Sequence, residues 1–271
     1  MTIDVEGIKA GQRMMWSTGD YPTIAEHISE AADVLVQLAD VRAGQRVLDV
    51  ATGSGNVAIV AARRGANVTG LDLTPELLEV ARSRAAGEGL EIELIEGDAE
   101  ALPFPDAAYD RVTSCFGVMF APRQRVAAQE LLRVVRPGGS VAVAAWTPEG
   151  LNGKMFQTVA SHLPPPPAEL TSPVMWGDEE HVRGLLADTS AELEFARRTV
   201  TFQHESPESW LDFNVRVLGP TILAKAALEP QGRWSALEAD LLALYRDSNE
   251  ADDGTLRVQA EYLITLAHIP A

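Results

Sequence analysis

The segment most suited to binding a nucleotide is VLDVATGSGN, residues 47–56. In such a segment a strand ends, small residues let the backbone approach a ligand, and a helix begins with its N-terminus directed at that ligand. The letters GSGNVA also fit the loosest dinucleotide fingerprint, G-x-G-x-x-G/A. This match alone is weak support for NAD, because most strand-to-helix turns of such sheets need small residues.

Three aspartates at predicted strand ends indicate which ligand this loop favours. Asp49 precedes the turn, where it would repel a pyrophosphate and attract a sulfonium or an ammonium group. Asp72 ends the second strand, where a carboxylate can accept hydrogen bonds from both ribose hydroxyls, as in NAD sites. Asp98 follows the third strand and can accept a hydrogen bond from an adenine amino group. With no arginine or lysine expected nearby for a phosphate, the charge favours a sulfonium cofactor over NAD.

Alternating strands and helices are expected to position these aspartates. Continuous apolar character, as in SVAVAAW, is typical of a strand covered on both faces. The alternation predicts an α/β fold with a doubly wound, mostly parallel sheet. The expected strands are residues 46–50, 67–73, 91–97, 110–116 and 140–146, and the expected helices include residues 22–40 and 123–134.

Composition limits the classes of partner. The formal net charge of −17 would repel phosphate backbones and anionic membrane surfaces, so no nucleic-acid partner is expected. A single cysteine allows no intramolecular disulfide, and no apolar run reaches the roughly 20 residues of a membrane span. The N-terminus does not resemble a signal peptide, so a cytoplasmic location is predicted. The sequence leaves the oligomeric state open.

Five motifs in a fixed order resemble the class I S-adenosylmethionine-dependent methyltransferases, within them the small-molecule branch that includes the ubiquinone and menaquinone C-methyltransferases. The resemblance covers roughly residues 44–150, which it implies to be a Rossmann-like core binding S-adenosylmethionine (SAM) in a seven-stranded sheet. The motifs are VLDVATGSGN, VTGLDLTPELLEVAR, GDAEALPFPDAAYDRV, FGVMFAP and ELLRVVRPGGSVAVAAW.

The resemblance assigns two groups of residues to the methionine end of the cofactor. Asp49, Ala51 and Gly53 form the first motif against the methionine moiety, and Ser114 would lie near the same moiety. Phe116 would line the acceptor side. The family pattern usually has glycine where this chain has Ala51, which makes a positive φ at that position improbable.

The resemblance also assigns the nucleoside end. Asp72 would hold the ribose hydroxyls, and Leu73 would pack on the adenine. Asp98 would bind the adenine amino group, while the backbone of Ala99 reaches the ring.

The N-terminal segment, residues 1–43, is expected to be helical and to close over the cofactor. Trp16 and Tyr21 flank a Gly-Asp turn and could present aromatic faces to a pocket. Core packing of the same two residues is nearly as consistent with the sequence.

Residues 151–271 are expected to complete the sheet and to hold acceptor specificity. By the resemblance, ELEFARRTVTFQ and AEYLITLAHI form a final antiparallel pair. The long connection between them, about residues 206–253, predicts a helical cap over the acceptor, with plain packing on the sheet edge as the alternative. Its large apolar residues are Trp210, Phe213, Leu218, Trp234 and Leu241.

A general base is needed only where the methyl acceptor must lose a proton. The candidates in the variable half are His181 and His204, with His162 a further possibility. No pair of histidines has metal-site spacing, so no metal is predicted. Cys115, inside an apolar strand, is predicted to be a buried core thiol rather than a nucleophile.

Two functions are compatible with these residues. The first is a SAM-dependent methyltransferase that transfers a methyl group by in-line displacement to a small, partly apolar acceptor, such as a quinone-like molecule or a secondary metabolite. The second is a SAM-binding protein that uses the cofactor structurally or for a non-methylating reaction such as a cyclisation. An RNA methyltransferase is disfavoured by the acidic charge.

Overall fold

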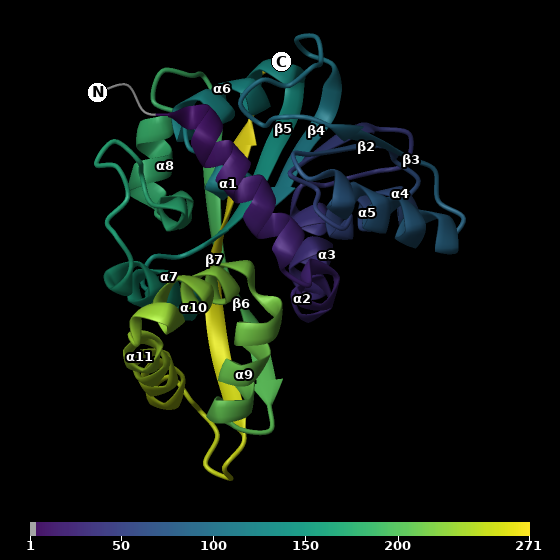
Figure 1. Cartoon of the computed structure of the whole chain (residues 1–271). Coiled ribbons are helices and arrows are strands. Elements are labelled where there is room, and N and C mark those ends of the chain that lie inside the picture. Colours follow the sequence, from purple (N-terminus) through teal and green to yellow (C-terminus); the bar gives the residue numbers. More distant parts are fainter. Residues whose placement is uncertain (1–3) are drawn as a thin grey trace.

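Seven strands form one sheet in the order β3-β2-β1-β4-β5-β7-β6, in a computed structural model that describes residues 4–271 (Figure 1). Strands β1 to β5 run parallel, while β7 lies antiparallel to both β5 and β6. This arrangement confirms the predicted mostly parallel, seven-stranded sheet with a final antiparallel pair. The strands are β1 Arg46–Val50, β2 Asn67–Asp72, β3 Ile92–Glu96, β4 Tyr109–Cys115, β5 Val135–Trp146, β6 Glu192–His204 and β7 Leu256–His268.

Helices precede, connect and extend the sheet. None in the described part of the chain is long and apolar enough to cross a membrane. The α-helices are α1 Val5–Thr18, α2 Tyr21–His27, α3 Ser29–Leu38, α4 Asn56–Arg63, α5 Pro75–Gly87, α6 Gln124–Val134, α7 Leu151–His162, α8 Glu179–Leu185, α9 Pro207–Val217, α10 Gly219–Leu228 and α11 Trp234–Asp247, and the 3₁₀ helices are η1 Val118–Phe120, η2 Pro173–Gly177 and η3 Glu229–Gln231.

The strand order reverses between β1 and β4. The crossover through α4 leads outward from β1 to β2, and the crossover through α6 leads outward from β4 to β5 in the opposite direction. Because such crossovers are right-handed, α4 and α6 cover opposite faces of the sheet. A reversal of this kind opens a crevice at the carboxyl ends of the two central strands, where ligands of open α/β sheets bind.

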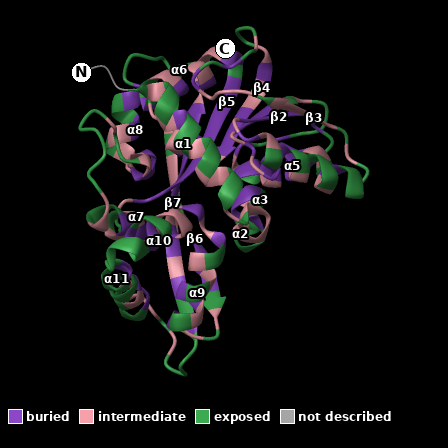
Figure 2. Ribbon diagram, viewed as in Figure 1, coloured by how far each residue is buried: buried purple, intermediate pink, exposed green. Residues whose placement is uncertain are grey.

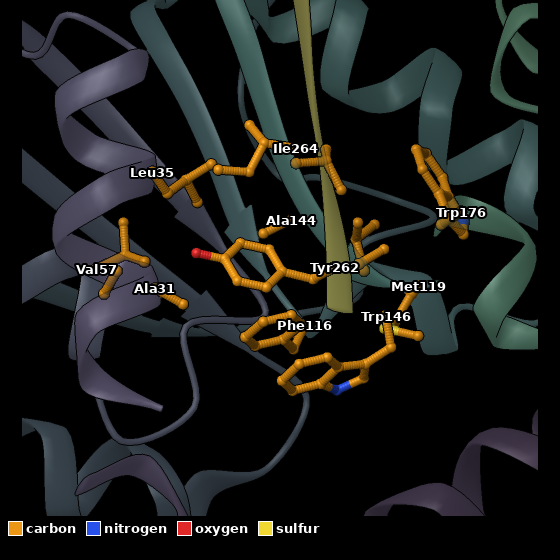
Figure 3. Packing of buried hydrophobic residues seen from close by; sticks show 14 of the residues in the cluster. Ala31, Leu35, Val57, Phe116, Met119, Ala144, Trp146, Trp176, Tyr262 and Ile264 are labelled. Carbon is orange, nitrogen blue, oxygen red and sulfur yellow. The ribbon is translucent and has the colours of Figure 1, made fainter. Parts of the chain in front are cut away.

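The hydrophobic core lies between the central strands and the helices that cover them. Leu48 and Val112 on the central strands are fully buried, and Ala31 and Leu35 of α3 face them from one side. Figure 3 shows Tyr262 of β7 among apolar side chains that include Leu35, Ala144 and Phe116. In Figure 2 the central strands are largely buried, whereas the outward faces of the helices are exposed. This burial explains why SVAVAAW is apolar at almost every position.

Two local predictions differ from the structure. The expected single helix over residues 22–40 is divided into α2 and α3, because Ile28 leaves helical geometry with a φ of −113°. The expected strand 140–146 begins earlier in the structure, because β5 starts at Val135 and includes the glycines of RPGG, at an irregularity in the β4–β5 register. Gly138 has a φ of 72° there, which glycine adopts without strain.

The antiparallel pair continues beyond the parallel part of the sheet. Helices α9, α10 and α11 connect β6 to β7 and gather around this extension together with α7 (Figure 1). The segment 206–253 is therefore helical, as its sequence predicts. That it covers an acceptor, and that the chain divides at residues 43 and 150, stay predictions.

Candidate active site

A cavity of about 250 Å³ opens at the carboxyl ends of β1 to β4. The strand ends form its floor, α1 and α2 form one wall, and α7, β6, α9 and the start of α10 form another. Most residues assigned to the cofactor from the sequence meet here. Those that line the cavity are Trp16, Tyr21, Asp49, Ala51, Gly53, Asp72, Leu73, Asp98, Ala99 and Phe116.

The carboxylate of Asp49 lies on the floor and is only 1 % exposed. The hydroxyl groups of Thr52 and Thr113 donate hydrogen bonds to its two oxygens, at 2.6 and 2.9 Å. Burial raises the pKa of Asp49 to about 7, the negative charge of nearby Asp72 adds to this rise, and the two hydroxyls oppose it. Asp49 can therefore act on a cationic ligand through its charge, and each of its oxygens already accepts a hydrogen bond from the protein.

Asp72 organises the loop that follows β1. Its Oδ2 accepts the backbone N–H of Gly53 at 2.8 Å, and its Oδ1 accepts that of Thr74 at 2.8 Å. Burial raises the pKa of Asp72, and these N–H groups oppose the rise. Each carboxylate oxygen can accept more than one hydrogen bond, so Asp72 retains capacity for two ribose hydroxyls.

Asp98 has a cationic partner that the sequence did not suggest. Its Oδ2 lies 2.5 Å from the ammonium nitrogen of Lys9 on α1, and its Oδ1 accepts the backbone N–H of Glu100 at 2.8 Å. Lys9 also lines the cavity and lies 2.6 Å from Glu100. The expectation that no lysine lies near these strand ends is therefore wrong. This lysine is paired with two carboxylates and is not free for a phosphate.

The backbone at Ala51 contradicts the sequence-based expectation. Its φ is 54°, in the left-handed region, although a positive value was judged improbable for alanine. The sharp turn lets the next two N–H groups reach β2, where Thr52 donates to the carbonyl of Leu71 at 3.0 Å and Gly53 donates to Asp72. Phe116, at the end of β4 and also lining the cavity, has a φ of 57°. Backbone strain of this kind concentrates at functional sites.

Replacing Ala51 with glycine should stabilise the protein by several tenths to about 1 kcal/mol. Left-handed geometry costs alanine about 1–2 kcal/mol, whereas glycine adds about 0.4–1 kcal/mol of backbone entropy to the unfolded chain. Urea unfolding measures the difference. Ala61→Gly, in the middle of α4 at a buried position, is the matched control and should destabilise. Equal destabilisation by both variants would contradict a strained Ala51.

Two neighbours on β4 are placed differently from their predictions. Ser114 is fully buried and does not line the cavity, since its hydroxyl accepts the N–H of Val118 at 3.0 Å. Cys115 packs partly buried against the core and also lines the cavity, so it is less enclosed than its prediction as a buried core thiol. Burial, with the negative charge of Asp49 nearby, raises the pKa of the Cys115 thiol well above its ordinary value and keeps it protonated.

Helices α1 and α2 wall one side of the cavity with aromatic rings. The ring of Trp16 packs edge-to-face on Tyr21 and on Phe120, with centroids 4.9 and 4.7 Å apart. The hydroxyl of Tyr21 accepts the N–H of Gly219 at the start of α10, at 3.2 Å. The N-terminal segment is thereby joined to the helices that connect β6 and β7.

The part of the cavity away from the aspartates is strongly aromatic. Trp210 stacks between Phe202 and Phe213, with centroids 5.0 and 5.3 Å apart. Of the large apolar residues noted between β6 and β7, Trp234 and Leu241 are buried elsewhere in the core. Other residues that line the cavity on this side include Phe116, Phe120, Trp146, Asn152, Phe156, Asn214 and Leu218.

The histidines proposed from the sequence do not line the cavity. His181 forms a 2.8 Å hydrogen bond with Gln124, His204 forms one of 2.6 Å with Ser209, and His162 pairs with Asp240. His27 at the end of α2 does line it, packing edge-to-face on Phe213 with centroids 5.1 Å apart. Within residues 4–271, its ring has no hydrogen-bond partner. No local motif marks His27, so sequence reasoning missed it.

Known proteins are similar to this chain in sequence and in fold. A family model described as a methyltransferase domain matches residues 47–139. Uncharacterized protein Rv1403c of Mycobacterium tuberculosis is 43 % identical over 258 residues, covering 94 % of this chain and 93 % of that protein. A demethylmenaquinone methyltransferase of Thermus thermophilus is 40 % identical over 134 residues, covering 48 % of this chain and 61 % of the enzyme.

A solved structure has the same fold. The crystal structure of a putative methyltransferase from Bacillus halodurans matches 89 % of this chain and 99 % of its own, with a TM-score of 0.63 and 23 % identity. The aspartates at three strand ends and the small-residue loop fit a cofactor that joins a nucleoside to a cationic sulfur. The chain belongs to the class I S-adenosylmethionine-dependent methyltransferases, and SAM is its cofactor.

Proposed function

We propose that this protein methylates a small, neutral, largely aromatic molecule such as a hydroquinone or a related phenol. The observation that carries the proposal is the aromatic half of the cavity, built around Phe202, Trp210 and Phe213. Among the described lining residues there is no arginine, and Lys9 is neutralised by two carboxylates. A carboxylate or phosphate on the acceptor would find no counter-charge there.

The cofactor would lie along the strand ends. Asp72 would accept the ribose hydroxyls, Asp98 the adenine amino group, and Leu73 would pack on the ring. The loop containing Ala51 and Gly53 would hold the methionine end. Asp49, whose charge faces the same region, would favour the positive sulfur.

Methyl transfer needs alignment and exclusion of water more than it needs a base. SAM supplies an electrophilic methyl group on a positively charged sulfur. An acceptor atom placed in line with the carbon–sulfur bond of SAM would take up this methyl group, and the electron pair of that bond would remain on the sulfur. The aromatic walls would hold the acceptor ring in line with this bond and exclude water.

For a phenolic acceptor, the proton would go to His27. This histidine replaces His181 and His204 as the candidate base because it is on the cavity wall with its ring nitrogens unengaged by residues 4–271. The demethylmenaquinone methyltransferase relative supports a quinone-like acceptor through its own name.

The proposal is tested by following S-adenosylhomocysteine (SAH) formation with a naphthohydroquinone, a catechol and phosphoethanolamine as acceptors. Turnover is expected with the first two and not with the third. Trp210→Leu should raise the acceptor KM roughly tenfold, because an aromatic stack and apolar contact area are lost. SAH affinity should stay close to that of the wild type.

Trp234→Leu is the matched control, because Trp234 belongs to the same group of helices but does not line the cavity. It should lower stability while the acceptor KM stays unchanged. Turnover of phosphoethanolamine in preference to the aromatic acceptors would contradict the proposal. So would an equal rise in KM for the two tryptophan variants.

A further inference from the structure

Helix α1 runs diagonally in front of the sheet in the view of Figure 1. Lys9, Gln12 and Trp16 on one face of this helix line the cavity. On this face Gln12 donates its side-chain N–H to the carbonyl of Phe120 at 2.6 Å, and Arg13 donates to the carbonyl of Leu73 at 3.0 Å. Lys9, one turn earlier, is the buried residue of the helix. A lysine is rarely buried unless it is paired with an opposite charge.

The ammonium group of Lys9 completes a compact charge cluster. Its side chain is 7 % exposed and lies 2.5 Å from Asp98 and 2.6 Å from Glu100. Glu100 is fully buried and is held by Arg123, whose Nε lies 2.8 Å away. Two carboxylates thus face two cations. Hydrogen bonds and charge attraction from Asp98 and Glu100 raise the pKa of Lys9, although its burial acts in the opposite direction.

The two carboxylates share one nitrogen but differ in exposure. Glu100 has no exposed side-chain surface, whereas the Asp98 side chain is 29 % exposed and lines the cavity. The N–H of Glu100 fixes one Asp98 oxygen and Lys9 fixes the other. Each oxygen retains a lone pair, so Asp98 is a carboxylate held in one orientation with acceptor capacity toward the cavity.

We propose that Lys9 is a positioning residue for adenine recognition, which holds Asp98 in the orientation that accepts the 6-amino group of the cofactor. This inference rests on the assignment of Asp98 in the proposed function. Without the ammonium group, Asp98 Oδ2 loses the partner that fixes it, and repulsion from the Glu100 carboxylate adds to this loss, so Asp98 rotates away from the cavity. This rotation removes the acceptor that distinguishes adenine from a purine without an amino group.

The test compares two ligands by calorimetry. One is SAH and the other is its analogue with hydrogen in place of the purine 6-amino group. The wild-type protein should bind SAH about 10- to 100-fold more tightly, as expected for one hydrogen bond to a charged group. In Lys9→Met this preference should fall to about twofold or less, because the substitution lowers the affinity for SAH and leaves the affinity for the analogue unchanged.

Arg13→Met is the matched control. It removes another polar attachment of α1 and leaves Lys9 and Asp98 in place. This variant should lower the affinity for both ligands by the same factor and keep the wild-type preference for SAH. If Lys9→Met also lowered the affinity for both ligands by the same factor, Lys9 would serve only to attach α1 to the rest of the protein. The inference would then be overturned.

A second variant tests the same inference if Lys9→Met alone does not fold. Lys9→Met leaves the buried Glu100 with Arg123 alone, so Lys9→Met combined with Glu100→Gln removes the excess negative charge. Because Asp98 Oδ2 still lacks its ammonium partner, this double variant should also have lost the preference for SAH. A wild-type protein that binds both ligands equally would refute the Asp98 assignment itself. A protein that binds neither would refute the proposed cofactor site, so the failures are distinguishable.

Discussion

Asp72→Ala is expected to weaken SAH binding by roughly 100-fold or more. Without this carboxylate, the two ribose hydroxyls would lose their hydrogen-bond acceptor. Each hydrogen bond to a charged group contributes about 1.5–3 kcal/mol. The substitution also frees the N–H groups of Gly53 and Thr74, which Asp72 now accepts at 2.8 Å each. The loop after β1 would lose one of its attachments to β2, adding a loss at the methionine end. Calorimetric titration with SAH measures the effect.

Asp110→Ala is the control for this variant. Asp110 likewise accepts a backbone N–H, from Arg46 at 2.6 Å, and pairs with Arg136 at 2.6 Å, but it does not line the cavity. Its loss should reduce the melting temperature and leave SAH affinity within about twofold of wild type. Asp72→Asn, which keeps one acceptor oxygen, should fall between wild type and Asp72→Ala. Unchanged affinity in Asp72→Ala would show that the ribose assignment is wrong.

The second large effect is a pH dependence that originates at Asp49. Its pKa is raised to about 7 in the folded protein, against an ordinary value of about 3.9 when unfolded. Between these values the folded state holds a proton that the unfolded state has released. The free energy of unfolding should therefore fall as pH rises from about 4 to 7 and be level above that. Asp49 contributes roughly 4 kcal/mol to this fall, at about 1.4 kcal/mol per pKa unit.

Asp49→Asn should flatten this slope. Asp72, whose pKa is also raised by burial, still contributes a fall in the variant. The asparagine is a poorer partner for Thr52 and Thr113, which donate to the carboxylate. This lowers stability at every pH, so the slope between pH 4 and 7 is the diagnostic measurement. Urea unfolding at several pH values measures it, and an unchanged slope would rule out Asp49 as its source.

The same ionisation should distinguish SAM from SAH. The sulfur of SAM is positive and that of SAH is neutral, so only SAM gains from the ionised Asp49. The affinity of SAM relative to SAH should rise with pH through about 7, by roughly tenfold for each 1.4 kcal/mol of attraction. In Asp49→Asn the ratio of the two affinities should be independent of pH over this range. A wild-type ratio that does not change with pH would contradict a charge role for Asp49.

Local patterns in the sequence determined the framework of the cofactor site. The apolar strands and their helical connections predicted the parallel sheet, and the carboxyl ends of parallel strands meet at one edge. Asp49, Asp72 and Asp98 stand at such ends, so their convergence on one cavity followed without any long-range information. The length of the connection between β6 and β7 predicted additional helices in the same way.

Tertiary contacts decided the features that sequence reasoning missed. Lys9 meets Asp98 across 89 positions, and no periodicity encodes that contact. Cys115 faces the cavity, and His27 reaches its wall, because of how α2, β4 and α9 are oriented around it.

Ala51 shows the physical reason most directly. A residue's intrinsic preference opposes a positive φ by about 1–2 kcal/mol. The hydrogen bonds that Thr52 and Gly53 make to the end of β2 exist only when the turn is left-handed. Local preference therefore sets the strands and helices, while bonds between distant segments can outweigh it where the loops of the site are held.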